Sequence, residues 1–264
     1  AHALYFDYLA SCGFSKYIPS THWQTLLFSA NRSAVFPQHG GLAVWLATIN
    51  PGFLEELLGI QPELLLTSID AIQVIRPEKL CEALLRRVES LSYQQRHCES
   101  INNNLNRLKG ENTSALLKNV LSDMNISSSV ADAAARIAVA CEYSELADVL
   151  ATRVLNNALC LRDRIRSAYA VCELENKQAA ARLKILLPIE PAKDPQDELR
   201  GVVLRACWPD CLTPSELVTH LIKPQEENLL GAYKMFLVHD LPNKLPDIVN
   251  AGNDYSLLVW ALSH

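Results

Sequence analysis

Three aligned stretches of the sequence decide the fold. They are Ala135–Leu155 (ARIAVACEYSELADVLATRVL), Arg166–Leu187 (RSAYAVCELENKQAAARLKILL) and Gly201–Ile222 (GVVLRACWPDCLTPSELVTHLI). Each reads as the end of one helix, a tight turn and a second amphipathic helix. Repeated helix pairs of ~30–45 residues are typical of HEAT-like solenoids, in which a pair completes its core by stacking on its neighbours. The sequence therefore predicts an all-α fold, a HEAT-like α-solenoid of stacked antiparallel helix pairs.

The three stretches share particular positions. The aligned cysteines are Cys141, Cys172 and Cys207, and an acid stands nine residues before each of them. These acids are Asp132, Asp163 and Glu198. We expect them to cap the first helix of a pair or to bind an arginine of the next repeat, a structural role. The cysteines are expected to be small apolar fillers where two helices meet.

Helix-start signals recur elsewhere in the chain. Asn50-Pro51, Asp194-Pro195 and Thr213-Pro214 each place a capping side chain before a proline at the first helical position. Glu216 completes a capping box with Thr213. The only weak candidate for a strand is Ala71–Ile75.

Composition excludes several classes of protein. The chain has 264 residues, of which 49% are hydrophobic, and a formal net charge of −5, so neither a disordered chain nor a basic nucleic-acid binder is expected. The longest apolar stretches are far shorter than the ~20 residues that span a bilayer. Eight cysteines are spread through the helical patterns, which favours a reducing cytoplasm. The first residue is Ala, and we expect a piece of a longer protein.

Three segments resemble a known family. Leu4–Ala10 (LYFDYLA) resembles the helix that follows the nucleotide-binding NACHT module of bacterial STAND-type NTPases. Phe36–Asp70 is similar to the "A-x-W-L-A…N-P…F…L-L…P-E-x-L-L…D" segment of those proteins. Asp197–Leu237 is similar to their "D-E-L-R-G-x-x-L-R-A-x-W-P" and "G-A-Y-x-x-F-L" stretches. The shared positions are of core and turn type.

The resemblance implies a region of a larger signalling protein. Residues 1–125 would follow the NACHT module directly, and residues 126–264 would be HEAT-like repeats continuous with them. The phosphate-binding motif G-x-x-x-x-G-K-[ST] is missing, and no Gly-Lys pair occurs anywhere. The resemblance thus implies a non-catalytic sensor and scaffold, often in bacterial defence, which binds a protein trigger or neighbouring domains.

The sequence contains no catalytic or metal-binding pattern that we recognise. No G-x-S-x-G or H-E-x-x-H motif is present. Cys207 and Cys211 could supply half of a zinc site, but no second Cys/His pair with ligand spacing follows. We therefore expect no catalytic residue, no cofactor and no metal, and we expect all cysteines to be reduced.

A basic band is the one candidate for a binding surface. Residues 151–187 contain seven Lys/Arg and three acids, a local charge of +4 in a chain of −5. Second helices usually line the concave side of a solenoid, so Arg153, Arg182 and Lys184 are expected to face one groove that accepts an acidic protein. Two alternatives stay open. The band, with Arg162 and Arg166, could bind nucleic acid, or its charges could be solvated or paired between repeats.

Overall fold

The computed structural model describes residues 2–31, 33–68, 75–90, 104–225 and 230–244. Within these ranges every regular element is helical, and an isolated bridge between Phe28 and Val35 is the only β contact. The prediction of an all-α chain is therefore confirmed for this part. Residues 71–74 of the strand candidate lie outside the described residues. The chain divides into two compact units, residues 1–117 and 118–264.

Unit 1 consists of short helices in succession. They are α1 (His2–Tyr17), α2 (Ser20–Leu27), α3 (Gly40–Ile49), α4 (Pro51–Ile60) and α6 (Pro77–Ser90), followed by α7 (Glu111–Ser122), which crosses the boundary between the units. Short 3-10 helices lie at Pro37–His39, Pro62–Thr67 and Leu105–Leu108. In this unit α3 packs against α1 and α4, and α4 packs against α6.

Aromatic side chains fill the centre of unit 1. The ring of Phe53 lies 5.8 Å from that of Trp23 and 5.9 Å from that of Phe28, centroid to centroid, and all three are buried. Asn50 positions Phe53 because the Asn50 side chain caps α4, accepting a hydrogen bond from the Phe53 amide at 2.9 Å. The predicted helix start at Asn50-Pro51 is thus confirmed.

Unit 2 contains the three aligned stretches. Its helices are α8 (Ser128–Ala140), α9 (Ala147–Leu155), α10 (Leu161–Glu173), α11 (Lys177–Leu183), α12 (Glu198–Cys207), α13 (Pro214–His220) and α14 (Ala232–Met235). Short 3-10 helices lie at Ser144–Leu146, Lys184–Leu186 and Pro191–Lys193, and α14 continues into a π-helical turn at Phe236–Asp240.

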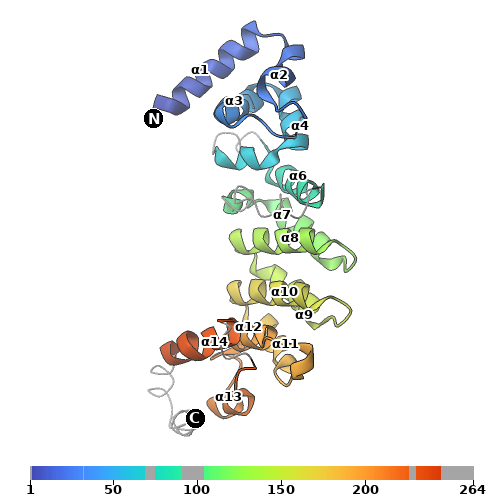
Figure 1. Ribbon diagram of the computed structural model, residues 1–264, viewed down its shortest axis with the longest axis vertical. Helices are drawn as coiled ribbons and strands as arrows, with labels where there is room; N and C mark the ends of the chain where they lie inside the picture. Colours follow the sequence, from blue (N-terminus) through green and yellow to red (C-terminus); the bar gives the residue numbers. More distant parts are fainter. Residues whose placement is uncertain (1, 32, 69–74, 91–103, 226–229, 245–264) are drawn as a thin grey trace. The chain divides into compact units, whose positions relative to one another are not determined.

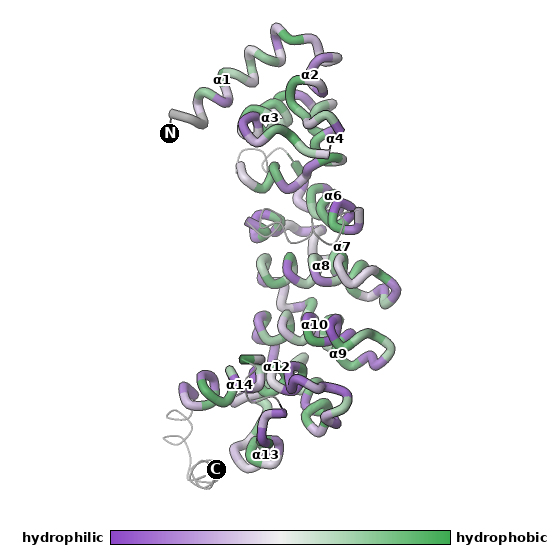
Figure 2. The backbone as a smooth tube through the Cα atoms, in the orientation of Figure 1, coloured by the Kyte–Doolittle hydropathy of each residue, from purple (hydrophilic) through white to green (hydrophobic). Residues whose placement is uncertain are grey.

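The helices of unit 2 pack in sequence order (Figure 1). First helices pack on first helices, since α10 contacts both α8 and α12. The second helix α11 packs on α9, and each of the two also packs on a first helix. Apolar and polar residues alternate along α8, α9 and α10 (Figure 2), as amphipathic helices require. The core between them consists of small and aliphatic residues, among them Ala138, Leu150 and Val203, all fully buried.

Two predicted helix starts in unit 2 have different outcomes. The capping box at Thr213 is confirmed: its hydroxyl accepts from the Glu216 amide at 3.2 Å, and Glu216 accepts from the Thr213 amide at 2.9 Å. The start at Asp194-Pro195 is wrong, because α12 begins at Glu198. Asp194 nevertheless serves that helix, since its carboxylate accepts hydrogen bonds from the amides of Leu199 and Arg200.

Candidate functional site

Arg153, the first of the three predicted groove residues, is fully buried. Its Nη1 donates to the carbonyl oxygens of Leu121 and Asp123, both at 3.0 Å. These carbonyls lie at the end of α7, where helical carbonyls lack intrahelical partners and where a cation is favourable. Burial lowers the pKa of Arg153. The prediction that Arg153 faces a groove is therefore wrong: the residue fastens α9 to the end of α7.

Arg182 and Lys184 lie at the surface, and each binds a neighbouring repeat. Arg182 forms an ion pair of 3.2 Å with Asp148 of α9, and its Nη2 donates to Thr152 at 3.0 Å. Lys184 pairs with Glu216 of α13 at 2.6 Å. This hydrogen bond, aided by the Thr213 amide, lowers the pKa of Glu216 to about 2. Both cations thus already have anionic partners within the chain.

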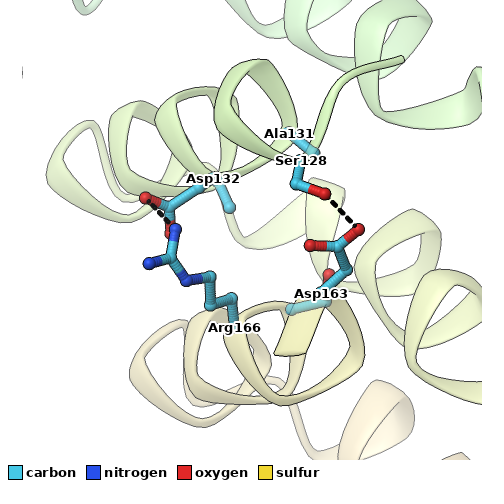
Figure 3. A pocket seen from close by; sticks show the side chains of 7 residues that line it. Ser128, Ala131, Asp132, Asp163 and Arg166 are labelled. Atoms are coloured by element: carbon cyan, nitrogen blue, oxygen red, sulfur yellow. Dashed lines mark hydrogen bonds and ion pairs between the residues drawn. The ribbon is translucent and has the colours of Figure 1, made fainter. Parts of the chain in front are cut away.

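The first-helix row has its own polar junction between α8 and α10 (Figure 3). Asp132 of α8 pairs with Arg166 of α10 at 2.7 Å, and with Arg136 of its own helix at 3.1 Å. Beside this pair, the Ser128 hydroxyl donates to Asp163 Oδ2 at 2.7 Å. In the first contact α8 supplies the acid and α10 the arginine, whereas in the second α8 supplies the hydroxyl and α10 the acid.

The two pairs line a small pocket of about 10 Å³, which is roughly the least space that holds one water molecule. Asp163 Oδ1 is buried and has no hydrogen-bond partner among the described residues. The charged residues around this pocket join α8 to α10, and the pocket is too small to admit a substrate.

Glu198, the third of the repeated acids, joins three segments. It accepts from the Tyr169 hydroxyl of α10 at 2.6 Å through one oxygen, and from the Ala232 amide of α14 at 2.7 Å through the other. Burial and the Glu198 hydrogen bond raise the pKa of Tyr169 well above its ordinary value. The expected pairing of an acid with an arginine of the next repeat is confirmed for Asp132. All three acids connect neighbouring repeats.

Six of the seven cations of the basic band form a hydrogen bond or an ion pair within the described part of the chain. Arg164 is buried and donates to the Val154 carbonyl at 2.7 Å, and exposed Lys177 pairs with Asp210 at 2.7 Å. Arg153, Arg166, Arg182 and Lys184 have the partners given above. Arg162 is exposed. The structure thus distributes the band over several repeat junctions and does not collect it into one surface.

The cysteines of the aligned stretches have packing roles. Cys141 and Cys207 are fully buried, and the Cys207 thiol donates to the Ala180 carbonyl at 3.2 Å. Burial raises the pKa of Cys207 to about 12, so it is a protonated thiol and a poor nucleophile at neutral pH. The Cys211 thiol donates to the Lys177 carbonyl, and Cys207 and Cys211 are both free thiols. Within the described part of the chain, no group of three or more His, Cys, Asp or Glu side chains could hold a metal ion.

A buried polar network at the start of α12 was missed by the sequence reasoning. Asp194 and Asp197 are both buried, and the side chain of Gln225 donates to the Asp194 carbonyl and to Asp197 Oδ1. Arg200, also buried, donates to the Ile189 carbonyl at 2.6 Å. The signal that could have found it is the spacing of Asp194, Asp197 and Arg200, three charged residues that recur every three positions directly before the apolar run 201–204.

Among the residues that the structure describes, no helix is long and apolar enough to cross a membrane. No protein-family model, curated protein or solved structure matches the chain.

Proposed function

We propose that the chain is a HEAT-like α-solenoid that acts as a non-catalytic scaffold. The observation that carries this proposal is the set of side-chain contacts between successive helix pairs of unit 2. Asp132–Arg166, Arg182–Asp148 and Lys184–Glu216 each join residues 32 to 34 positions apart, which is one repeat length. Contacts of one repeat length are expected when each repeat binds only its neighbours.

The scaffold is proposed to belong to a bacterial STAND-type NTPase, downstream of its NACHT module and in the cytoplasm. Its support is the resemblance of Leu4–Ala10, Phe36–Asp70 and Asp197–Leu237 to that family. In this role the chain binds a protein trigger or neighbouring domains, and the nucleotide chemistry takes place elsewhere in the protein. Gly201 of the D-E-L-R-G stretch illustrates the type of residue shared, since it is buried where α12 meets α14.

The nucleic-acid alternative has less support. Binding along a phosphate backbone needs several cations that are free to approach it. In the basic band, Arg153 and Arg164 are buried, and Arg166, Arg182, Lys177 and Lys184 are paired with acids. These observations favour the structural interpretation of the band.

One pair of variants tests the repeat junctions. Arg166→Ala removes a half-buried ion pair with Asp132 and should cost about 1 kcal/mol of unfolding free energy, near the top of the range for such pairs. Arg162→Ala is the matched control, because it removes the same charge one turn earlier on α10 from an exposed position. Urea denaturation should show a loss for Arg166→Ala alone. Equal effects of the two variants would contradict the proposed role of the junction.

A second experiment tests the assignment to a signalling NTPase. The coding sequence upstream of residue 1 should contain a G-x-x-x-x-G-K-[ST] motif, and the complete protein should hydrolyse ATP. Deletion of residues 126–264 from the complete protein should change the rate of hydrolysis, whereas the isolated chain should have none. ATP turnover by the isolated chain, or an upstream sequence without the motif, would refute the assignment.

A further inference from the structure

Unit 1 contains a cleft between α4 and α6 that the scaffold role does not require. Glu55 and Gly59 of α4 line one side, and Lys79, Arg86, Arg87 and Ser90 of α6 line the other. Its volume is about 350 Å³, within the range of small-molecule sites, which begins at about 300 Å³. The lining mixes aliphatic carbon with charged groups, as such sites commonly do.

The charge of the cleft is unbalanced. Three cations of α6 line it, and among the described residues of the lining Glu55 is the only acid. Lys79 forms an ion pair with Glu55. Arg86 approaches Glu82, one turn earlier on its own helix, at 3.6 Å, but both side chains are largely exposed. An exposed pair at this distance contributes little, so the cleft keeps an excess of positive charge.

Arg87 has hydrogen-bonding capacity that its surroundings do not use. Its Nη2 donates to the Ser33 carbonyl at 3.2 Å, which fixes the guanidinium against the loop before α3. Its Nε has no hydrogen-bond partner among the described residues, but it is buried and out of reach of a ligand. Burial raises the pKa of Glu63, and the charge of Arg87 offsets this only in part. Glu63 Oε2 also has no hydrogen-bond partner in the part of the chain that the structure describes. The guanidinium is therefore held in place, and only its terminal nitrogens can face a molecule in the cleft.

We infer that this cleft binds a small phosphate-bearing molecule, with Arg87 and Lys79 as the residues that contact the phosphate. A positioned guanidinium matches the geometry of a phosphate, and an ammonium adds a second charge. The volume exceeds that of one phosphate ion, so the bound molecule carries further atoms along the aliphatic wall. Glu55 competes with the phosphate for Lys79. This inference is independent of the scaffold proposed for the repeats.

Gly59 offers a way to block the cleft without disturbing the fold. A Cβ atom added at Gly59 would meet no atom within 4 Å, so a larger side chain has room there. Gly59→Leu should fill part of the cleft and should not lower the melting temperature. Arg87→Gln removes the guanidinium, and Glu55→Gln releases Lys79 from its partner. The variants therefore test the binding constant in both directions, because two of them should weaken binding and Glu55→Gln should strengthen it.

The test is isothermal titration calorimetry, in which the full chain is titrated with inorganic phosphate, with pyrophosphate and with a sugar phosphate. Because a charge-assisted hydrogen bond contributes ~1.5–3 kcal/mol, Arg87→Gln should weaken binding about tenfold or more. Gly59→Leu should weaken it similarly, and Glu55→Gln should strengthen it. Arg162→Gln, an exposed arginine of unit 2, should leave it unchanged.

Tighter binding of the sugar phosphate than of inorganic phosphate would support an organic ligand, and the reverse order would limit the ligand to the anion itself; either result supports the cleft as a phosphate site. No saturable binding of any of the three probes up to about 10 mM, beyond which affinity is weaker than that of specific ligands, would overturn the inference. Binding that Gly59→Leu and Arg87→Gln both leave unchanged would overturn it equally.

Discussion

Gly201→Ala should destabilise unit 2 strongly, although the same change usually stabilises a helix. Gly201 lies inside α12 and is buried where the backbone of α14 crosses it. A Cβ atom there would lie closer than 3.0 Å to backbone atoms of Ala232 and Tyr233. Backbone atoms cannot relieve the overlap by rotating about a side-chain bond, so α12 and α14 must move apart.

The magnitude follows from what α14 buries. Tyr233 and Phe236 are 1% and 0% exposed, and full burial of such a side chain contributes ~1.5–3 kcal/mol. Loss of these two burials therefore costs ~3–6 kcal/mol, and a partial shift with overpacking costs ~1–3 kcal/mol. The gain in helix propensity offsets ~0.5–1 kcal/mol. We expect a net loss of about 3 kcal/mol.

Gly13→Ala is the matched control for this prediction. Gly13 also lies inside a helix, α1, but a Cβ atom there would meet nothing within 4 Å. The variant should show only the propensity gain. Urea denaturation followed by circular dichroism measures both variants, and hydrogen exchange should show protection lost at residues 232–241 in Gly201→Ala. A Gly201→Ala chain as stable as the wild type, with unchanged exchange, would refute the steric argument.

Three further predictions concern single side chains. Thr213→Ala should cost ~0.5–2 kcal/mol in urea denaturation, and Thr213→Ser should not, because serine keeps the cap. Since Lys184 lowers the pKa of Glu216 to about 2 from an ordinary value of 4.5, the stabilisation should be complete above pH 4.5 and be lost as the pH falls toward 2. A thermal melt series should therefore be flatter for Glu216→Gln over that range; parallel curves would contradict the pairing. Iodoacetamide at about pH 8 should label exposed Cys160 in the native chain but buried Cys207 only after unfolding, as mass spectrometry can show.

Much of the fold could be predicted from the sequence because its signals are local. The capping box at Thr213 and the cap at Asn50 depend on residues within three positions, and both are present. The pairing of Asp132 with Arg166 could be predicted because the repeat length places the two on facing helices. Helical periodicity also predicted an all-α chain.

The orientation of the basic residues could not be predicted, for a geometric reason. The second helices α9, α11 and α13 begin six, five and seven residues after the aligned Cys141, Cys172 and Cys207. Each residue of difference rotates the following side chains by about 100° around the helix axis. Arg153 and Lys184, which align in sequence, therefore point differently. The partners of Arg153 are two backbone carbonyls at the end of α7, and they carry no sequence signal.

The contacts between successive repeats also have a consequence for folding. Most of the side-chain bonds described between helix pairs in unit 2 close loops of about 30 residues, and loop entropy grows only slowly with such lengths. Chains dominated by contacts of short sequence separation fold rapidly and can nucleate at more than one place. A pair of helices can thus unfold at one end of unit 2 while pairs further along stay closed. That behaviour would allow a partner to unfold a terminal helix pair while the other pairs stay folded.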